Sequence, residues 1–382
     1  ISSVVSPMLY YNNKVWRGPV GSIVRLRKMF GERVFVVLLL AGIAVANPVM
    51  ADAPNVVVSI KPIHSLVAGV MKGVGTPHLL LQGSASPHTY SLRPSGARAL
   101  EQADVVFWVG EVIEHFLIKS LPSVATTAQI VELMEEGNIR VLPARAGGTW
   151  EAHAHEEDKH DAHGHEKHGH DDHTDEHRDG HKEAHAHKDE HAEDKHAHDK
   201  HGHNEGAPEH LDGHIWLDPR NGAAIVEVAA RVLSTADPAN AVNYHKNADD
   251  LLARLSMLEK EIATMVAPVK RVPYVVFHDA YQYLETRFGL NAIGSISVHT
   301  GRAPSAKRLY ELRSKIVELG ANCVFSEPQF ESKLVGTVAE GTEAHSGVLD
   351  PLGADLPPGD DAYFRLMRQF ADSLTTCLGQ QF

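Results

Sequence analysis

The sequence predicts an α/β fold in which two α/β lobes with parallel-type sheets are joined by one long rigid helix. In both halves of the chain, short apolar runs rich in Val, Ile and Phe alternate with stretches of helical periodicity. Strands that are apolar on both faces and alternate with helices are typical of parallel sheets covered on both sides. A single long helical stripe separates the two halves. The 382 residues suffice for two ordinary domains.

Three strands are predicted in the first half, at 55–60, 78–83 and 105–110. A helix follows the first strand, and Pro62 lies in its first turn, where proline is tolerated. The stretch "RPSGARALEQA" indicates another helix, for which Ser95 is the candidate N-cap. Strand and helix therefore alternate here as a parallel sheet requires.

A long helix is predicted from about Pro238 to Val266. Its apolar positions recur at steps of four and three residues: Leu251, Leu255, Leu258, Ile262 and Met265. Nearly thirty residues of helix would be roughly 40 Å long, the length of a domain. We therefore expect an N-terminal lobe at 52–236, a connecting helix at 237–268 and a C-terminal lobe at 269–382.

The second half repeats the alternation. Strands are predicted at 274–279, 292–297, 322–327 and 347–352. A helix with one apolar face, formed by Leu309, Leu312, Ile316 and Leu319, lies between them, and a last helix is predicted from about Asp361 to Leu378.

An export signal is predicted within residues 1–51, which also include an upstream segment. The stretch "RLRKMFGERVFVVLLLAGIAVANPVMADAP" has a basic start, an apolar core and a small-residue end, and cleavage is expected near Ala51. The alternative is a membrane anchor, but the apolar core is well short of the roughly 20 residues that span a bilayer.

Export bears on the two cysteines, Cys323 and Cys377. An oxidising compartment allows them to form a structural disulfide, which we favour and which would contribute roughly 4 kcal/mol in the chain-entropy model. The alternative is a pair of zinc ligands, although cysteines so far apart lack the close spacing usual in such sites.

Residues 151–210 are exceptionally rich in histidine. They hold 18 of the 27 histidines, and 19 acidic residues against 7 Lys or Arg give them a net charge of −12 out of −13 for the chain. Almost no apolar residue is present, so we expect a disordered surface loop. The rest of the chain is nearly neutral and offers no basic face, which excludes nucleic acid as a partner.

Four good metal ligands lie at or just past the ends of apolar runs: His88 in "SASPHTY", His214 in "GHIWLDP", His278 in "YVVFHDAY" and Asp350 in "GVLDPLG". In open α/β sheets, ligands bind at the carboxyl ends of strands. A cleft between two lobes could therefore bring three imidazoles and a carboxylate together. Such a set suits Zn²⁺, which accepts nitrogen and oxygen ligands in a tetrahedron.

The motifs "SIKPIHSLVAGV", "SPHTYSLRPS", "DVVFWVG", "HIWLDP", "VVFHDAYQYLE", "CVFSEPQF" and "LDPLG" together resemble one family. It is the zinc-specific group of cluster A-I metal-binding proteins, the ZnuA-type periplasmic solute-binding proteins. The resemblance runs from about Asn55 to Leu378, interrupted by the histidine-rich segment. It implies a protein of the periplasm, metal in the interlobe cleft, and delivery of zinc to the membrane permease of an ABC transporter with its cytoplasmic ATPase.

The resemblance assigns the first three ligands to His88, His214 and His278. Manganese-binding relatives carry a glutamate at the third position, so His278 argues for zinc. The acid of the last lobe corresponds to Asp350, although water or another carboxylate can take the fourth place in such proteins. The family also commonly has a disulfide in the second lobe and a charged, histidine-rich insertion before the second ligand.

Two further residues have open interpretations. His64 follows the first strand and is either an auxiliary donor near the cleft or an ordinary residue. Glu327 in "SEPQF" is either an acceptor that orients a ligand imidazole or a solvated acid.

The expected function is non-enzymatic zinc binding by a monomer. Two alternatives stay open at this stage: a periplasmic zinc buffer that acts through the histidine-rich loop, and a secreted zinc hydrolase. Against the hydrolase, the sequence has neither H-E-x-x-H nor G-x-S-x-G, and it has no phosphate-binding G-x-x-x-x-G-K-[ST] loop.

Overall fold

The structure is a computed structural model that describes residues 53–145, 150, 211–296, 305–330 and 333–380. The predicted export signal, its cleavage near Ala51 and the predicted loop at 151–210 lie outside the described residues. Among those that are described, no helix combines the length and the apolar character needed to cross a membrane.

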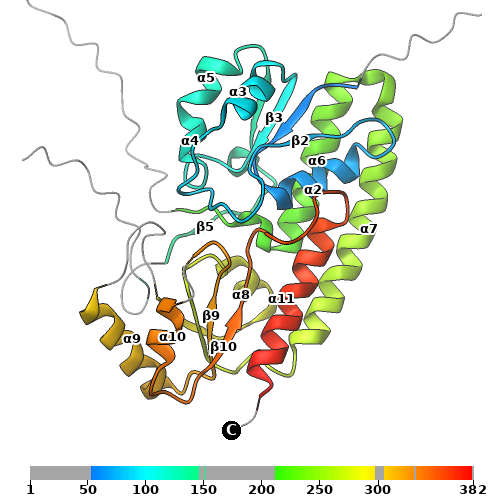
Figure 1. The fold of residues 1–382 in the computed structure, drawn as a ribbon. Coiled ribbons are helices and arrows are strands. Elements are labelled where there is room, and N and C mark those ends of the chain that lie inside the picture. Colours follow the sequence, from blue (N-terminus) through cyan, green and yellow to red (C-terminus); the bar gives the residue numbers. More distant parts are fainter. Residues whose placement is uncertain (1–52, 146–149, 151–210, 297–304, 331–332, 381–382) are drawn as a thin grey trace, which may run out of the picture. The chain divides into compact units, whose positions relative to one another are not determined.

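The first sheet has four parallel strands in the order β2-β1-β3-β4 (Figure 1). Their bounds are β1 Val56–Val58, β2 His78–Leu79, β3 Val105–Trp108 and β4 Gln129–Glu132. Val57 and Val106 belong to a small core with the outer helices, which are α3 Pro94–Glu101, α4 His115–Ile118 and α5 Ser120–Val124. Val58 and Phe107 belong to the main core on the other face. The sheet is therefore covered on both sides, as predicted.

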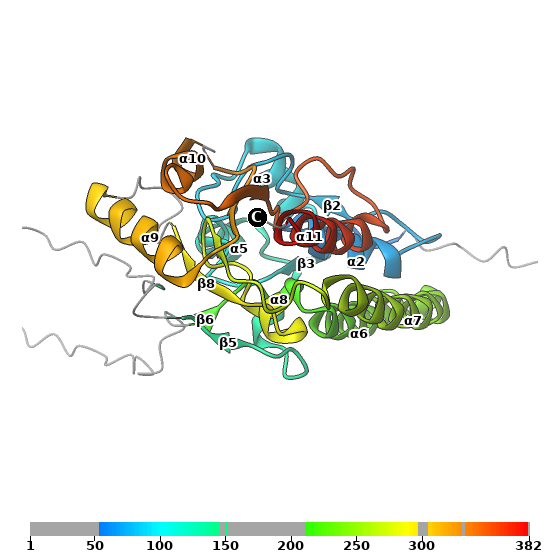
Figure 2. The same ribbon diagram turned by 90° about the horizontal axis from the view of Figure 1, so that it is seen from below.

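The second sheet is also parallel, in the order β10-β9-β7-β8. Its strands are β7 Tyr274–Val276, β8 Ala292–Ser295, β9 Cys323–Ser326 and β10 His345–Val348. Numbered within each half, both sheets have the strand order 2-1-3-4. Val275 and Val324 form a separate core with α9 Ala306–Leu319 and α10 Lys333–Ala339, on the face away from α11. Figure 2 shows α9 and α10 on one side and α11 on the other.

One layer of helices serves the inner faces of both sheets. It consists of α2 Lys61–Val70, α6 Pro219–Ala236, α7 Ala241–Val266 and α11 Ala362–Leu378. Buried residues of these helices and of both sheets form one continuous core. The predicted long helix is α7, and it packs against α6, α11 and α2 rather than crossing alone (Figures 1 and 2). The domain boundaries at 236/237 and 268/269 stay predictions.

The apolar stripe of α7 faces this core, with Leu251, Leu255, Leu258 and Ile262 buried. The helix before it begins sharply, because Asp218 caps α6 by accepting the N–H of Arg220 and Pro219 takes the first helical position. Asp218 also accepts two hydrogen bonds from Arg287 of α8, Gln282–Phe288. This charged cap ties the helix layer to the second half.

Several predicted boundaries are wrong. Ser95 is not the N-cap of α3; the helix begins at Pro94, whose fixed φ suits the first position, and Arg93 is the N-cap without a side-chain bond. The last strand ends at Val348 and not at 352, because the carboxylate of Asp350 accepts N–H bonds from Leu352 and Gly353 and turns the chain.

The sequence analysis missed some elements altogether. These include the edge strand β4, helices α4, α5, α6, α8 and α10, and a two-stranded antiparallel ladder of β5 Leu142–Pro143 with β6 Leu211–Asp212. Cys323 and Cys377 form the favoured disulfide and so are not zinc ligands. The bond joins the first residue of β9 to the last turn of α11.

Candidate metal centre

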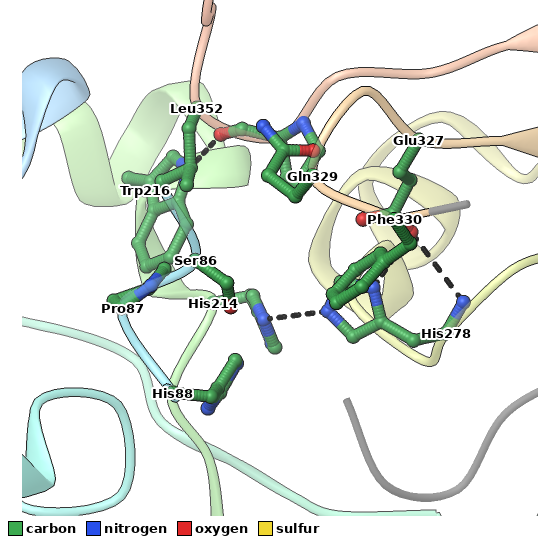
Figure 3. Close-up of a pocket in the computed structure, with 11 residues that line it drawn as sticks. Ser86, Pro87, His88, His214, Trp216, His278, Glu327, Gln329, Phe330 and Leu352 are labelled. Atoms are coloured by element: carbon green, nitrogen blue, oxygen red, sulfur yellow. Dashed lines mark hydrogen bonds and ion pairs between the residues drawn. The ribbon is translucent and has the colours of Figure 1, made fainter. Parts of the chain in front are cut away.

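Three histidines from distant parts of the chain meet in one small cavity (Figure 3). His88 lies in the segment after β2, His214 lies between β6 and the short helix η3 Ile215–Leu217, and His278 follows β7 by two residues. One ligand nitrogen from each lies within 4.8 Å of the others. His214 and His278 are buried, whereas His88 is half-buried.

The imidazole rings surround a common point. The centroid of His88 lies 5.6 Å from that of His214 and 6.0 Å from that of His278, and the latter two are 5.2 Å apart. The Nε2 atoms of His214 and His278 are separated by 3.3 Å. The cavity thus gathers nitrogen donors at the spacing of a single ion's coordination sphere.

Two of the three rings are oriented by carboxylates. Nδ1 of His278 lies 2.6 Å from Oε1 of Glu327, and Nδ1 of His214 lies 2.8 Å from Oδ1 of Asp212. A carboxylate favours the tautomer that carries its proton on Nδ1, which leaves the Nε2 lone pair for a metal. Two Nε2 lone pairs at this separation repel each other unless a shared proton or a cation lies between them. This arrangement is typical of metal-binding histidines.

The electrostatics of the cavity favour positive charge. Burial lowers the pKa of His278, but the negative charge of Glu327, with smaller contributions from Asp279 and Asp212, outweighs burial and leaves the pKa raised. The acids that hold this imidazole would stabilise a bound cation in the same way.

The cavity is small and mostly apolar outside the histidines. Trp216, Phe330, Pro351 and Leu352 line it, and the space for the centre of a water-sized sphere is about 10 Å³. One water molecule needs about that much room. The cavity therefore has the size for a single ion, and not for an organic substrate.

Asp350 is placed beside the cavity rather than in the group of three histidines. Its Oδ1 accepts hydrogen bonds from the backbone N–H groups of Leu352 and Gly353, both at 3.0 Å, and from Nε2 of Gln329 at 2.7 Å. Its Oδ2 accepts the N–H of Ala354. The carboxylate thus holds together the turn that forms one wall of the cavity.

The structure bears on the two residues with open interpretations, Glu327 and His64. Glu327 is only 2% exposed and accepts from an imidazole, so the interpretation as a solvated acid is wrong. The Nε2 of His64 lies 3.0 Å from the carbonyl of Pro77, and His64 is not among the described residues that line the cavity. Sequence reasoning missed Asp212; its signal was the D-x-H spacing that puts a carboxylate two residues before His214.

The base of the histidine-rich insertion is joined to the same site. The OH of Tyr283 accepts the N–H of Leu142 and donates to the carbonyl of Asp212, at 2.9 and 2.6 Å. Arg145 binds Asp279, next to His278, and Glu285 of α8. Burial raises the pKa of Glu285 to about 7 despite Arg145. Two of the three histidines are therefore braced by the residues that frame the insertion.

Two α/β sheets and a small cavity of imidazoles define the class: a metal-binding protein of the two-lobe, solute-binding type. The sequence matches the family described as zinc-uptake complex component A, periplasmic, over residues 56–377. The chain belongs to this ZnuA family.

Known proteins agree with this assignment. The high-affinity zinc uptake system protein ZnuA of Brucella suis biovar 1 is 46% identical over 329 residues, which cover 86% of this chain and 93% of that protein. ZnuA of Brucella abortus is 47% identical over 327 residues, with 86% and 92% covered. A crystal structure of ZnuA superposes with a TM-score of 0.63 at 22% identity and covers 85% of this chain and 99% of its own.

Family membership confirms the expected class of function. The family consists of transport components, so the chain is not an enzyme, and zinc is its metal. It also implies the periplasm as the compartment. The four predicted ligands, His88, His214, His278 and Asp350, stay predictions.

Proposed function

We propose that His88, His214 and His278 hold one Zn²⁺ in this cavity, and that the protein captures zinc in the periplasm and hands it to the permease of an ABC importer. The observation that carries the proposal is the convergence of one nitrogen from each ring within 4.8 Å. Three segments that are far apart in the chain meet there, which a merely structural role would not require.

Nitrogen donors favour zinc over harder ions. Zn²⁺ binds imidazole at about 2.0–2.1 Å and accepts four ligands in a tetrahedron, whereas Mn²⁺ prefers carboxylate and water oxygen. The carboxylates of Asp212 and Glu327 face Nδ1 atoms, so they act on the metal through the rings and not by direct contact. This set supports zinc as the cargo.

The fourth position goes to a water molecule rather than to Asp350. The carboxylate of Asp350 already accepts four N–H groups, and turning it toward the metal would leave backbone donors of the wall without their acceptor. His88 is only half-buried, so water has access to an ion held by the three rings.

We assign the histidine-rich segment an accessory role. Its many interchangeable histidines provide several weak sites, and its ladder base adjoins His214 through Asp212. It collects zinc when zinc is scarce, hands it inward or senses excess. The competing interpretation is a dispensable solvated segment, which unchanged zinc uptake under chelator starvation after its deletion would support. The protein acts as a monomer in this scheme, because all three ligands come from one chain.

The deciding experiment measures zinc bound by the mature chain lacking Glu151–His210, after stripping, reloading and competition with a chelator. We expect about one tightly held equivalent, lost when His88, His214 or His278 is replaced by alanine. His245→Ala is the matched control, because His245 is exposed on α7 and remote from the cavity. A deletion variant without tight zinc would instead make the protein a buffer that acts through the segment.

A further inference from the structure

Lys61, the first residue of α2, is a buried cation that reaches across the molecule. It is 5% exposed, and its Nζ donates to the carbonyl oxygens of Gly353, Ala354 and Leu356, the last two at 2.9 and 2.8 Å. An ammonium group has three donors, and here each has a carbonyl acceptor. A lysine is almost never fully buried unless it is paired in this way.

The carbonyls belong to the turn that forms one wall of the metal cavity. Pro351 and Leu352 line the cavity, and the carbonyl of Pro351 accepts the indole N–H of Trp216 at 2.8 Å. Asp350 binds the N–H groups of this turn from one side, and Lys61 binds its carbonyls from the other. Gly353 has a φ of +66°, which lets the chain present both sets of groups within residues 352–356.

The contact joins the two halves of the chain. Lys61 begins α2, shortly after β1 of the first sheet, whereas the turn follows β10 in the second. The partners are therefore about 290 residues apart in sequence. Burial lowers the pKa of Lys61, and the carboxylates of Asp350 and Asp355 oppose this shift by favouring the charged ammonium. The wall on the side of the second half is therefore fixed to the helix layer of the first half.

We propose that Lys61 is a positioning residue of the metal site, which holds the Pro351–Leu352 wall against Trp216 and so slows the escape of bound metal. The inference rests on the proposed function, since it presumes metal among the three histidines. Lys61 itself touches neither the imidazoles nor the space between them. Its action on the metal is through the turn.

Two other bonds join the start of the chain's first half to the same C-terminal region and provide matched controls. Ser65 of α2 accepts the N–H of Tyr363 at 2.9 Å, and Lys72, just after α2, binds Asp360 at 2.8 Å. Both partners lie beyond the cavity wall. If Lys61 only braced the fold, the loss of the buried Ser65 bond would affect metal release in the same way for the same loss of stability.

The test compares Lys61→Met, Ser65→Ala and Lys72→Met in the full mature chain. Zinc release into excess chelator is followed by stopped flow, the cobalt(II) absorption spectrum reports the ligand set, and hydrogen exchange follows the amides of residues 351–356. We expect Lys61→Met to release zinc at least about tenfold faster, the scale of effect seen for residues that orient metal ligands from outside. We also expect faster exchange in the wall and an unchanged three-nitrogen cobalt spectrum. The two controls should release zinc within about twofold of the wild type.

Unchanged zinc release in folded Lys61→Met would overturn the proposal, as would equal acceleration in Ser65→Ala at equal loss of thermal stability. If Lys61→Met does not fold, Lys61→Gln replaces it, because the amide keeps two N–H donors but removes the charge and the third donor to the turn. Faster release then supports the inference and unchanged release overturns it. A wild-type chain that held no zinc through its three histidines would overturn the proposed function, which is a distinct result read on the wild type alone.

Discussion

In the first sheet, strand β1 leads into Lys61, and β3 leads into Glu114, whose carboxylate accepts the N–H groups of Val109 and Gly110. Burial raises the pKa of Glu114 to about 7, yet this acid serves the local turn. In the second sheet the ends of β7 and β9 carry His278 and its carboxylate partner Glu327. The strand order is the same in both sheets, but only the second puts a candidate ligand directly at a strand end.

The candidate metal site therefore has a fixed side, formed by the second sheet, and an adjustable side, formed by the segment after β2. His278 and Glu327 follow adjacent strands of one sheet and are both buried. His88 lies nine residues beyond the end of β2, in a half-buried segment without regular structure. A site built on strands is held more precisely than one built on a loop. We infer that the second sheet sets the geometry and that the first sheet completes it.

The largest effects are expected when one ligand is deleted from each side of the site, which tests whether the two sides differ. Removing an imidazole should cost about 3 kcal/mol of zinc affinity, or roughly 100-fold, for His88→Ala. His278→Ala should cost more and also lower the melting temperature of the metal-free protein, because Glu327 is left buried without its partner. Chelator competition and thermal melts provide the measurements. Equal losses on both sides would argue against a fixed and an adjustable side.

The next effect concerns the carboxylate behind the fixed ligand. Glu327→Gln keeps the shape of the side chain but removes the charge that orients His278. We expect zinc affinity to fall about 10- to 100-fold, as for other partners of ligand histidines. Asp212→Asn is the matched variant on the His214 side. Affinities equal to the wild type in both variants would mean that the rings are held by packing alone.

Zinc affinity should also depend on pH. In the metal-free site, burial lowers the pKa of His278, but Glu327 and nearby acids outweigh burial and leave the pKa raised. Protons therefore begin to compete with the metal at a pH above the ordinary histidine pKa of about 6.5. Affinity should fall as the pH falls, about tenfold per unit for each competing proton below its pKa. In Glu327→Gln the fall should begin at lower pH. Competition titrations from pH 8 to 5 check this, and a flat profile would contradict an imidazole site.

The smallest effect is expected for Asp350→Asn. Asparagine keeps the Oδ1 acceptor that holds the wall, and the proposed fourth ligand is water. Zinc affinity should therefore change by less than about threefold, while the variant loses about 1–3 kcal/mol of stability from weaker bonds to the turn. Thermal unfolding and chelator competition on the same samples separate the two quantities. A loss of affinity above about tenfold, with an altered cobalt spectrum, would restore Asp350 as a ligand.

Much of the fold was predictable because its signals are local. The apolar runs of the strands and the four-three stripe of α7 arise from residues close together in sequence, and each marked an observed element. The 2-1-3-4 strand order and the shared helix layer depend on contacts between the two halves, which no local pattern encodes. The β5–β6 ladder has two residues per strand across the long insertion, which is too short for periodicity to reveal.

In the candidate site, too, local sequence signals were predictive and contacts between distant residues were not. His88, His214 and His278 were found because each follows an apolar run and matches a family motif. Asp350 was selected on the same grounds, but its role depends on where its carboxylate points, and the turn at 351–354 captures it. The partnership of Lys61 with that turn spans most of the chain and has no sequence signal at all.

The narrow base of the insertion, formed by β5 and β6, affects which segments this position of the chain can accept. Two residue pairs and the hydroxyl of Tyr283 close the chain on itself at Leu142 and Asp212, so the two ends are already adjacent whatever lies between them. The entropy of closing a flexible loop grows only slowly, by about 0.6 kcal/mol for each doubling of its length. Segments of very different length and composition can therefore be exchanged at this point with little penalty, which makes it a natural place to graft a reporter domain.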